Sequence, residues 1–191
     1  MTASSPDLAT PRVVVTVGTD HHPFARLVAW IDAWAADHPD VAVLVQRGTT
    51  PAPSDRPSVR WVEMVGYDDL VAAMAGADAV VAQGGPAAIM DARSVGHRPI
   101  AVPREGSRGE HVDDHQLRFT TWAATRDLVW RATTEAELVG LLDRALADPA
   151  ALRIPPDAGE APATIAAFRT LVDPLLAGRR AVRRRGDARR G

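Results

Sequence analysis

Short apolar runs rich in β-branched residues alternate with stretches of helical periodicity along most of this chain. The first run, residues 12–17, reads RVVVTV, which is typical of a parallel strand buried on both faces. In the stretch that follows, Leu27, Ile31 and Trp34 recur at helical spacing. Strands that alternate with helices form right-handed βαβ units. The chain is therefore expected to adopt an α/β fold with a doubly wound parallel sheet.

The same patterns divide the chain into elements and regions. A helix after residue 67 is expected to be capped by its acidic start, and another by a capping box at Thr134 and Glu137. Residues 1–11 are predicted to be a flexible leader, residues 12–177 one domain, and the arginine-rich residues 178–191 a disordered tail. The expected strands are 12–17, 41–45, 59–64, 78–82, 98–102 and 127–130, and the expected helices are 23–37, 68–75, 87–95, 113–124, 134–146 and 163–176.

Composition excludes several classes of function. The chain has 191 residues and no cysteine, which excludes disulfides and thiolate metal sites. Its net charge of −2 gives no reason to expect nucleic acid as a partner. No apolar run reaches the roughly 20 residues that span a bilayer, and the first residues lack the pattern of a signal peptide. These observations predict a cytoplasmic protein.

The segment from residue 83 to residue 116 carries most of the functional signal. It follows an apolar strand and opens with Gly84, Gly85 and a proline before a helical stretch. A strand, a glycine-rich turn and a helix N-terminus together form a phosphate site, because free N–H groups and the helix dipole favour negative charge. A second polar loop follows the next strand, so both loops are expected at one edge of the sheet. From the residues alone, the glycine pair is equally consistent with an ordinary loop.

Three motifs together resemble the nucleotide-sugar-binding half of the family-28 glycosyltransferases, which have the GT-B fold. They are VTVGT at residues 15–19, GGPAAIMDAR at 84–93 and GEHVDDHQ at 109–116. The chain is most similar to small stand-alone versions of that half, such as the soluble subunit of the dolichol-pathway N-acetylglucosaminyltransferase and its bacterial exopolysaccharide counterparts. The resemblance covers residues 12–150 and implies a Rossmann-like half of a GT-B fold.

The resemblance implies a contact set for the donor diphosphate at the glycine-rich turn. Gln83 stands where relatives usually carry histidine, and glutamine forms hydrogen bonds but exchanges no proton near neutral pH. Binding by this position is therefore expected, and proton transfer is not. The residues expected to bind the diphosphate are Gly18, Thr19, Gln83, Gly84, Gly85, Ala87 and Ala88.

The resemblance also implies positions for the nucleoside and the sugar. The backbone at Met64 and Val65 corresponds to the segment that reads the nucleobase, and Asp91 to an acidic residue that binds ribose hydroxyls. A solvated helix residue is the ordinary alternative for Asp91. Asp114 and Gln116 match the polar pair that holds sugar hydroxyls.

The loop before that pair supplies the expected catalytic residues, Glu110 and His111. His111 and His115 also have the spacing of a helical metal pair, but Val112 replaces the glutamate of an HExxH zinc motif. The GT-B enzymes that the chain resembles also generally work without a bound metal, so no metal and no other cofactor are expected.

The implied reaction is inverting transfer of a sugar from a UDP-sugar to a hydroxyl of a polyprenyl-diphosphate-linked saccharide. Full-length relatives bind the acceptor with their other half, so a membrane-attached partner subunit is expected to supply that site and to hold the chain at the inner face of the plasma membrane. Basic segments also gain roughly 1 kcal/mol per charge at an anionic leaflet. The alternative is a non-catalytic subunit that stabilises a partner transferase, which Gln83 slightly favours. A nucleotide-sugar 2-epimerase would need both halves.

Overall fold

The computed structural model of the chain describes residues 9–155. Their centre is a six-stranded sheet in the order β3-β2-β1-β4-β5-β6, and every neighbouring pair is parallel. This confirms the predicted doubly wound α/β fold. The strands are β1 Val13–Thr16, β2 Val43–Gln46, β3 Val59–Val62, β4 Ala79–Gln83, β5 Ile100–Val102 and β6 Trp130–Arg131.

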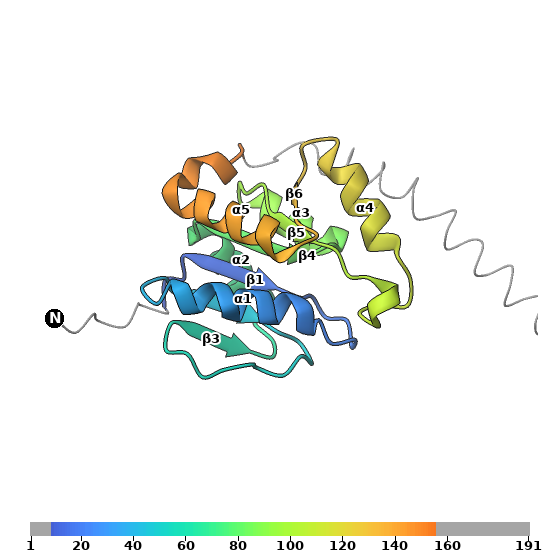
Figure 1. Cartoon of the computed structure of the whole chain (residues 1–191). Coiled ribbons are helices and arrows are strands. Elements are labelled where there is room, and N and C mark those ends of the chain that lie inside the picture. The colour runs from blue at the N-terminus through green and yellow to red at the C-terminus, as the bar shows by residue number, and fades with distance from the viewer. Residues whose placement is uncertain (1–8, 156–191) are drawn as a thin grey trace, which may run out of the picture. The chain divides into compact units, whose positions relative to one another are not determined.

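Helices cover both faces of the sheet (Figure 1). One face packs against the first and last of these helices, and the other face against the three between them. This is the layering that right-handed βαβ crossovers produce. The helices are α1 Ala25–Asp37, α2 Tyr67–Gly76, α3 Pro86–Ser94, α4 His115–Ala124 and α5 Glu135–Ala147, with 3-10 turns η1 Gly106–Arg108 and η2 Pro149–Leu152.

The apolar periodicity of the helices forms the larger core. Leu27 and Ile31 of α1 and Leu138 and Leu142 of α5 are fully buried against the sheet. Each such side chain contributes about 1.5–3 kcal/mol when it leaves water. On the other face, Met74 of α2 packs against the sheet in a second cluster. The central strands are thus apolar on both faces, as their continuous β-branched runs predicted.

Two local expectations were wrong: the strand at residues 127–130 and the acidic cap of α2. Residues 127–129 are not a strand, because Asp127 has a φ of 56° and the amide of Leu128 bonds back to the carbonyl of Ala123, which closes α4. Helix α2 has no side-chain cap: its N-cap is Gly66, and its acidic residues lie within the first turn. There they act through the helix dipole instead. The capping box of α5 at Thr134 is confirmed.

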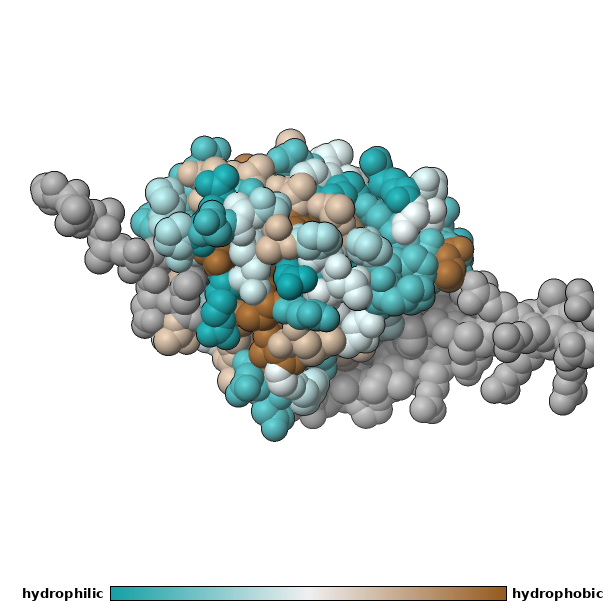
Figure 2. Space-filling view, turned by 90° about the horizontal axis from the view of Figure 1, so that it is seen from below, coloured by the Kyte–Doolittle hydropathy of each residue, from teal (hydrophilic) through white to brown (hydrophobic). Residues whose placement is uncertain are grey.

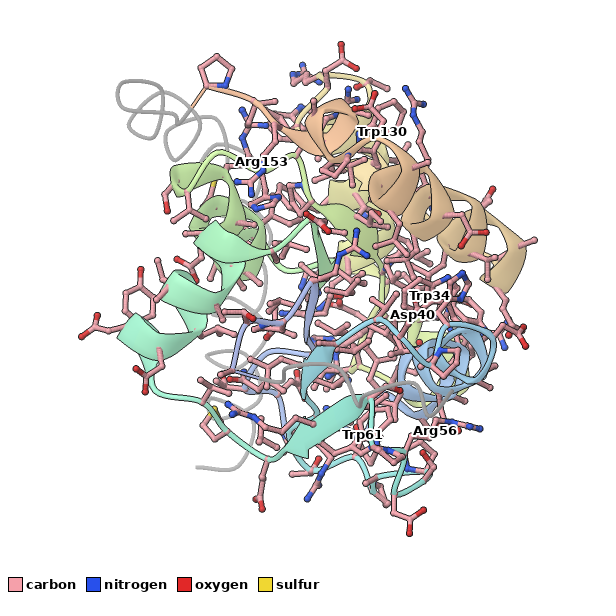
Figure 3. All side chains as sticks on the ribbon, turned by 90° about the vertical axis from the view of Figure 1, so that its left-hand side faces the viewer. Trp34, Asp40, Arg56, Trp61, Trp130 and Arg153 are labelled. Atoms are coloured by element: carbon pink, nitrogen blue, oxygen red, sulfur yellow. The ribbon has the colours of Figure 1, made fainter. Side chains whose placement is uncertain are left out.

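The amino ends of the strands lie along one side of the sheet, which is called the structural edge here and faces the viewer in Figure 3. Arg153 follows η2 and donates from Nη2 to the carbonyl of Ala77 at 2.7 Å, which satisfies the end of α2. The Trp130 ring lies 4.1 Å from the guanidinium carbon of Arg98. On the face shown in Figure 2, hydrophobic residues form small groups among hydrophilic ones. Across residues 9–155, no helix is long and apolar enough to cross a membrane.

Several expectations concern residues outside the described range. The helix predicted at 163–176, the arginine-rich tail at 178–191 and most of the leader at 1–11 lie there. They remain predictions, as does the domain boundary at residue 177.

Candidate functional site

The site lies at the carboxyl ends of β1 and β4, the two central strands of the sheet. From β1 the chain proceeds outward through β2 and β3, and from β4 it proceeds the other way through β5 and β6. Loops that leave β1 and β4 therefore diverge and open a crevice between them. In Figure 1 these carboxyl ends point to the right.

A cavity of about 300 Å³ occupies this crevice. Its walls come from the loop after β1, the end of β3, helix α2 and the first turns of α3. A concave site at a switch point, with an apolar wall and a few polar groups, is the ordinary form of a ligand site. The lining residues are Thr16, Gly18, Thr19, Gln46, Met64, Val65, Tyr67, Leu70, Met74, Gln83, Ala87, Ala88 and Asp91.

The side chain of Gln83 fits between two glycines at the base of this cavity. Gly18 has a φ of +76°, and a Cβ at that position would lie 2.7 Å from Nε2 of Gln83. A Cβ on Gly85 would also overlap Nε2 of Gln83. Gly84 is constrained from another side, because its Cβ would lie 3.0 Å from Cα of Pro103. The glycines thus make room for protein neighbours as well as for a tight turn.

A directed hydrogen-bond chain orients the Gln83 amide. The backbone N–H of Arg104 donates to Oε1 of Gln116 at 3.0 Å, and Nε2 of Gln116 donates to Oε1 of Gln83 at 2.6 Å. The side-chain carbonyl of Gln83 therefore already accepts a hydrogen bond, and its side-chain NH2 group lies next to Gly18 and Gly85. Gln83 accordingly offers a hydrogen-bond donor at the base of the cavity.

Helix α3 points its N-terminus at the same cavity. Pro86 occupies its first position, and the N-cap Gly85 makes no side-chain cap. The N–H groups of the first turn have no acceptor within the helix, and the positive end of its dipole lies there. Because Ala87 and Ala88 line the cavity, this turn is arranged to receive an anion.

One helical turn further on, Asp91 supplies a carboxylate to the cavity wall. The phenol of Tyr67, at the start of α2, donates to Oδ1 of Asp91 at 3.2 Å. The neighbouring negative charge of Asp91 and this hydrogen bond raise the pKa of Tyr67. The second oxygen of Asp91 remains for a ligand hydroxyl, since a carboxylate accepts several hydrogen bonds.

The remaining end of the cavity is lined by the segment after β3. Met64 is 56% exposed, one of three exposed large hydrophobic side chains in residues 9–155. The N–H of Val65 donates to Oε1 of the buried Gln46 at 3.1 Å, and Nε2 of Gln46 donates to Thr16 at 3.2 Å. This network fixes the backbone of the segment relative to β1 and β2. It also occupies the N–H of Val65, which is therefore not available to a ligand.

The loop after β5 is held to α1 by a buried ion pair. Both carboxylate oxygens of Glu110 accept from Arg26, each at 2.8 Å, and Oε2 also accepts from the N–H of Glu105 at 2.9 Å. Glu110 is only 5% exposed. Its carboxylate therefore acts here as a structural anchor.

Arg104 connects this loop to the one after β1. Its side chain is fully buried and donates to the carbonyls of Val17, His22 and Glu110 at 2.9, 2.8 and 3.0 Å. A buried charge requires such partners. The loop after β1 and the loop after β5 are thus joined by one guanidinium.

His111 lies where these loops meet. Its Nε2 is 3.1 Å from Oδ2 of Asp20. Burial, followed by the nearby His115, lowers the pKa of His111. Burial alone would raise the pKa of Asp20, but hydrogen bonds from the backbone and ring of His22 bring it below its usual value. At neutral pH the arrangement is a neutral imidazole beside a carboxylate.

Residues 12–166 match the glycosyltransferase family 28 C-terminal domain. The chain belongs to this family. The fold is also that of two solved structures, each 18% identical to this chain and covering 74% of it. The glycosyltransferase of kitacinnamycin aligns with a TM-score of 0.57 over 36% of its length, and MurG of Acinetobacter baumannii with a TM-score of 0.52 over 43% of its length.

The family-28 domain described here thus spans less than half the length of either similar structure. These likenesses show the GT-B type of fold. Comparison with curated proteins found no match.

The fold gathers most of the residues that the sequence predicted for donor binding in the family-28 domain. It also adds Tyr67 and Gln46, which lie in no motif, and Thr16, which lies in the VTVGT motif but was not among the predicted binding residues. Gly84 and Gly85 form the adjoining turn. The predicted residues that line the cavity itself are Gly18, Thr19, Met64, Val65, Gln83, Ala87, Ala88 and Asp91.

The predicted sugar-binding and catalytic residues lie beside the cavity instead of lining it. Gln116 is buried, with both amide atoms bonded to protein, and so reaches the cavity only through Gln83. Asp114 is exposed and accepts from the N–H of Gly106 at 2.8 Å. Glu110 is held by Arg26, and His111 by Asp20. Neither Glu110 nor His111 lines the cavity, so neither presents a proton acceptor to it.

Proposed function

We propose that this family-28 domain is the donor-binding part of an inverting glycosyltransferase that moves a sugar from a UDP-sugar to a polyprenyl-diphosphate-linked saccharide. The single observation that carries this proposal is the cavity that is lined by the N-terminal turn of α3, by Gln83 and by Asp91. An anion-receiving turn next to a hydroxyl-accepting carboxylate matches a nucleoside diphosphate.

In the proposed complex, the diphosphate lies at Ala87 and Ala88, and Asp91 accepts hydrogen bonds from the ribose hydroxyls. The base lies against Met64, with the carbonyls near Val65 available to its N–H groups. UDP is assigned as the nucleotide because of the family resemblance.

The reaction breaks the bond between the sugar C1 and the diphosphate oxygen, and UDP leaves with the electron pair. The acceptor hydroxyl forms the new bond to C1 from the opposite face, and its proton passes to a base. The N–H groups of α3 and the NH2 group of Gln83 stabilise the charge that develops on the leaving phosphate. Because such donors are already oriented, little reorganisation is needed during the reaction.

The proton acceptor and the acceptor site are assigned to a separate, membrane-attached subunit. This assignment rests on the family resemblance. The carboxylate of Glu110, which is fully engaged with Arg26 and the N–H of Glu105, supports it. Such a partner would hold this chain on the cytoplasmic side of the membrane. No metal is required for the donor contacts proposed here.

Calorimetric titration of UDP into the full chain tests the donor site. We expect micromolar binding, which Asp91→Ala weakens at least tenfold because the ribose hydroxyls lose their acceptor. The matched control is Asp37→Ala, which removes the same charge from the exposed end of α1. Absence of UDP binding both with and without the partner subunit would overturn the proposal.

A transfer assay then distinguishes a donor-binding catalytic role from the alternative of a non-catalytic stabilising subunit. We expect sugar transfer only when the chain and its membrane partner are combined with UDP-sugar and lipid-linked acceptor. Asp91→Ala should lower that transfer at least tenfold at limiting UDP-sugar while leaving the complex assembled. Unchanged transfer by an assembled Asp91→Ala complex would instead establish the stabilising role.

A further inference from the structure

Four histidines and two aspartates gather where the loop after β1 meets the loop before α4. The ring centroids of His22 and His111 are 5.8 Å apart, and those of His111 and His115 are 4.6 Å apart. The donor contacts proposed above use none of these side chains. The group consists of Asp20, His21, His22, His111, Asp113 and His115.

One ring nitrogen in this group is buried without a hydrogen bond. Nε2 of His111 lies 3.1 Å from Oδ2 of Asp20, which places the ring proton on that nitrogen. Nδ1 then carries a lone pair, and it is buried with no hydrogen-bond partner.

Two further ligand atoms lie next to that lone pair. Oδ1 of Asp113 is 3.8 Å from Nδ1 of His111 and 2.5 Å from Nδ1 of His115. One ligand atom from each of the three residues lies within 4.8 Å of the other two. Two imidazole nitrogens and one carboxylate oxygen form the ligand set of an open zinc site.

We propose that His111, Asp113 and His115 bind a zinc ion, with Asp20 positioning His111. Zinc bonds of about 2.0–2.2 Å place neighbouring tetrahedral ligands about 3.4 Å apart, so both measured separations need to change by less than about 1 Å. A carboxylate that holds the other nitrogen of a ligating histidine is the usual outer partner of such sites. The fourth position is left for water or an oxygen ligand.

The proposed site differs from the helical His pair of an HExxH motif. Helix α4 begins at His115, so His111 lies in the preceding loop, and Asp113 between them supplies the third ligand. The relevant pattern is therefore His-x-Asp-x-His. This metal site is separate from UDP binding at Asp91, and either proposal can fail without the other.

Titration of the metal-free full chain with Co²⁺ and Zn²⁺ tests the site. We expect one Co²⁺ per chain, with the intense visible absorption of a tetrahedral ion, and its displacement by one equivalent of Zn²⁺. His111→Ala and His115→Ala should each weaken zinc binding at least 100-fold. Asp20→Asn should weaken it by 10–100-fold, because the carboxylate only positions His111.

Two sets of variants make the result specific. His38→Ala removes a histidine that lies against Trp34, outside the group, and should leave zinc affinity unchanged. His21→Ala removes an exposed histidine of the alternative group with Asp20 and His22, and should also have no effect. His115→Asn serves if an alanine variant does not fold, because His115 is partly exposed. Absence of binding, binding retained without His115, or binding lost with His21 would each overturn the proposal.

Discussion

At the scale of single residues, Gln83 shows how the site is shaped by what surrounds a side chain. Its carbonyl is held by Gln116, and glycines at positions 18 and 85 leave room for its NH2 group. The sequence predicted that position 83 would bind without transferring protons. It did not predict that Gln116 would be its support, because that contact joins residues 33 apart and depends on the packing of α4.

Gly18→Ala should destabilise the domain by about 1–2 kcal/mol, because its φ of +76° is unfavourable for a residue with a Cβ. The added Cβ would also displace the Gln83 amide. Urea unfolding followed by circular dichroism measures the change. Gly140→Ala is the control: no atom lies within 4 Å of its Cβ in α5, so stability should rise by roughly 0.5–1 kcal/mol. Equal effects at both positions would contradict this account.

At the scale of elements, the sequence predicted strands and helices best where the local residue pattern agrees with the tertiary packing. The β-branched runs of the strands and the helical spacing of apolar residues in α1 and α5 are such local patterns, and the structure confirms the elements that they predicted. Helix α4 was harder to place. Its start is set by Asp113, which accepts from the N–H of His115, and its end by the left-handed Asp127. Such loop bonds have no periodic signature.

Thr134→Ala tests the capping box of α5. The hydroxyl of Thr134 accepts from the N–H of Glu137 at 3.3 Å, and Oε2 of Glu137 accepts from the N–H of Thr134 at 3.1 Å. Loss of the hydroxyl should reduce the free energy of unfolding by about 1 kcal/mol. Thr121→Ala is the control, because its exposed hydroxyl only bonds back to Leu117 of its own helix. A decrease no larger than that of the control would show that the box contributes nothing.

At the scale of the whole molecule, one buried histidine makes stability depend on pH. His97 is fully buried at the structural edge, and burial lowers its pKa to about 4. In the unfolded chain its pKa is near 6.5, so between these values the unfolded state binds more protons. The contribution of neutral His97 to the free energy of unfolding is therefore fully present above about pH 6.5 and decreases as the pH falls towards 4. For His97 the decrease reaches roughly 3 kcal/mol.

Urea unfolding at several pH values measures this dependence. His111, whose pKa is also lowered, adds a change of the same sign. His97→Leu should retain only the pH dependence that His111 contributes, so its free energy of unfolding should fall less steeply between pH 6.5 and 4. Parallel curves for the two proteins would exclude His97 as the source.

The buried guanidinium of Arg104 has a consequence for how this domain can be altered. It holds the carbonyls of Val17 and His22 in one loop and of Glu110 in the other. Neither loop can change its length or path without leaving that charge unpaired in the interior. The two loops can therefore be exchanged only together. A chimera that exchanges only one of them with a relative should misfold, whereas a paired exchange should be tolerated.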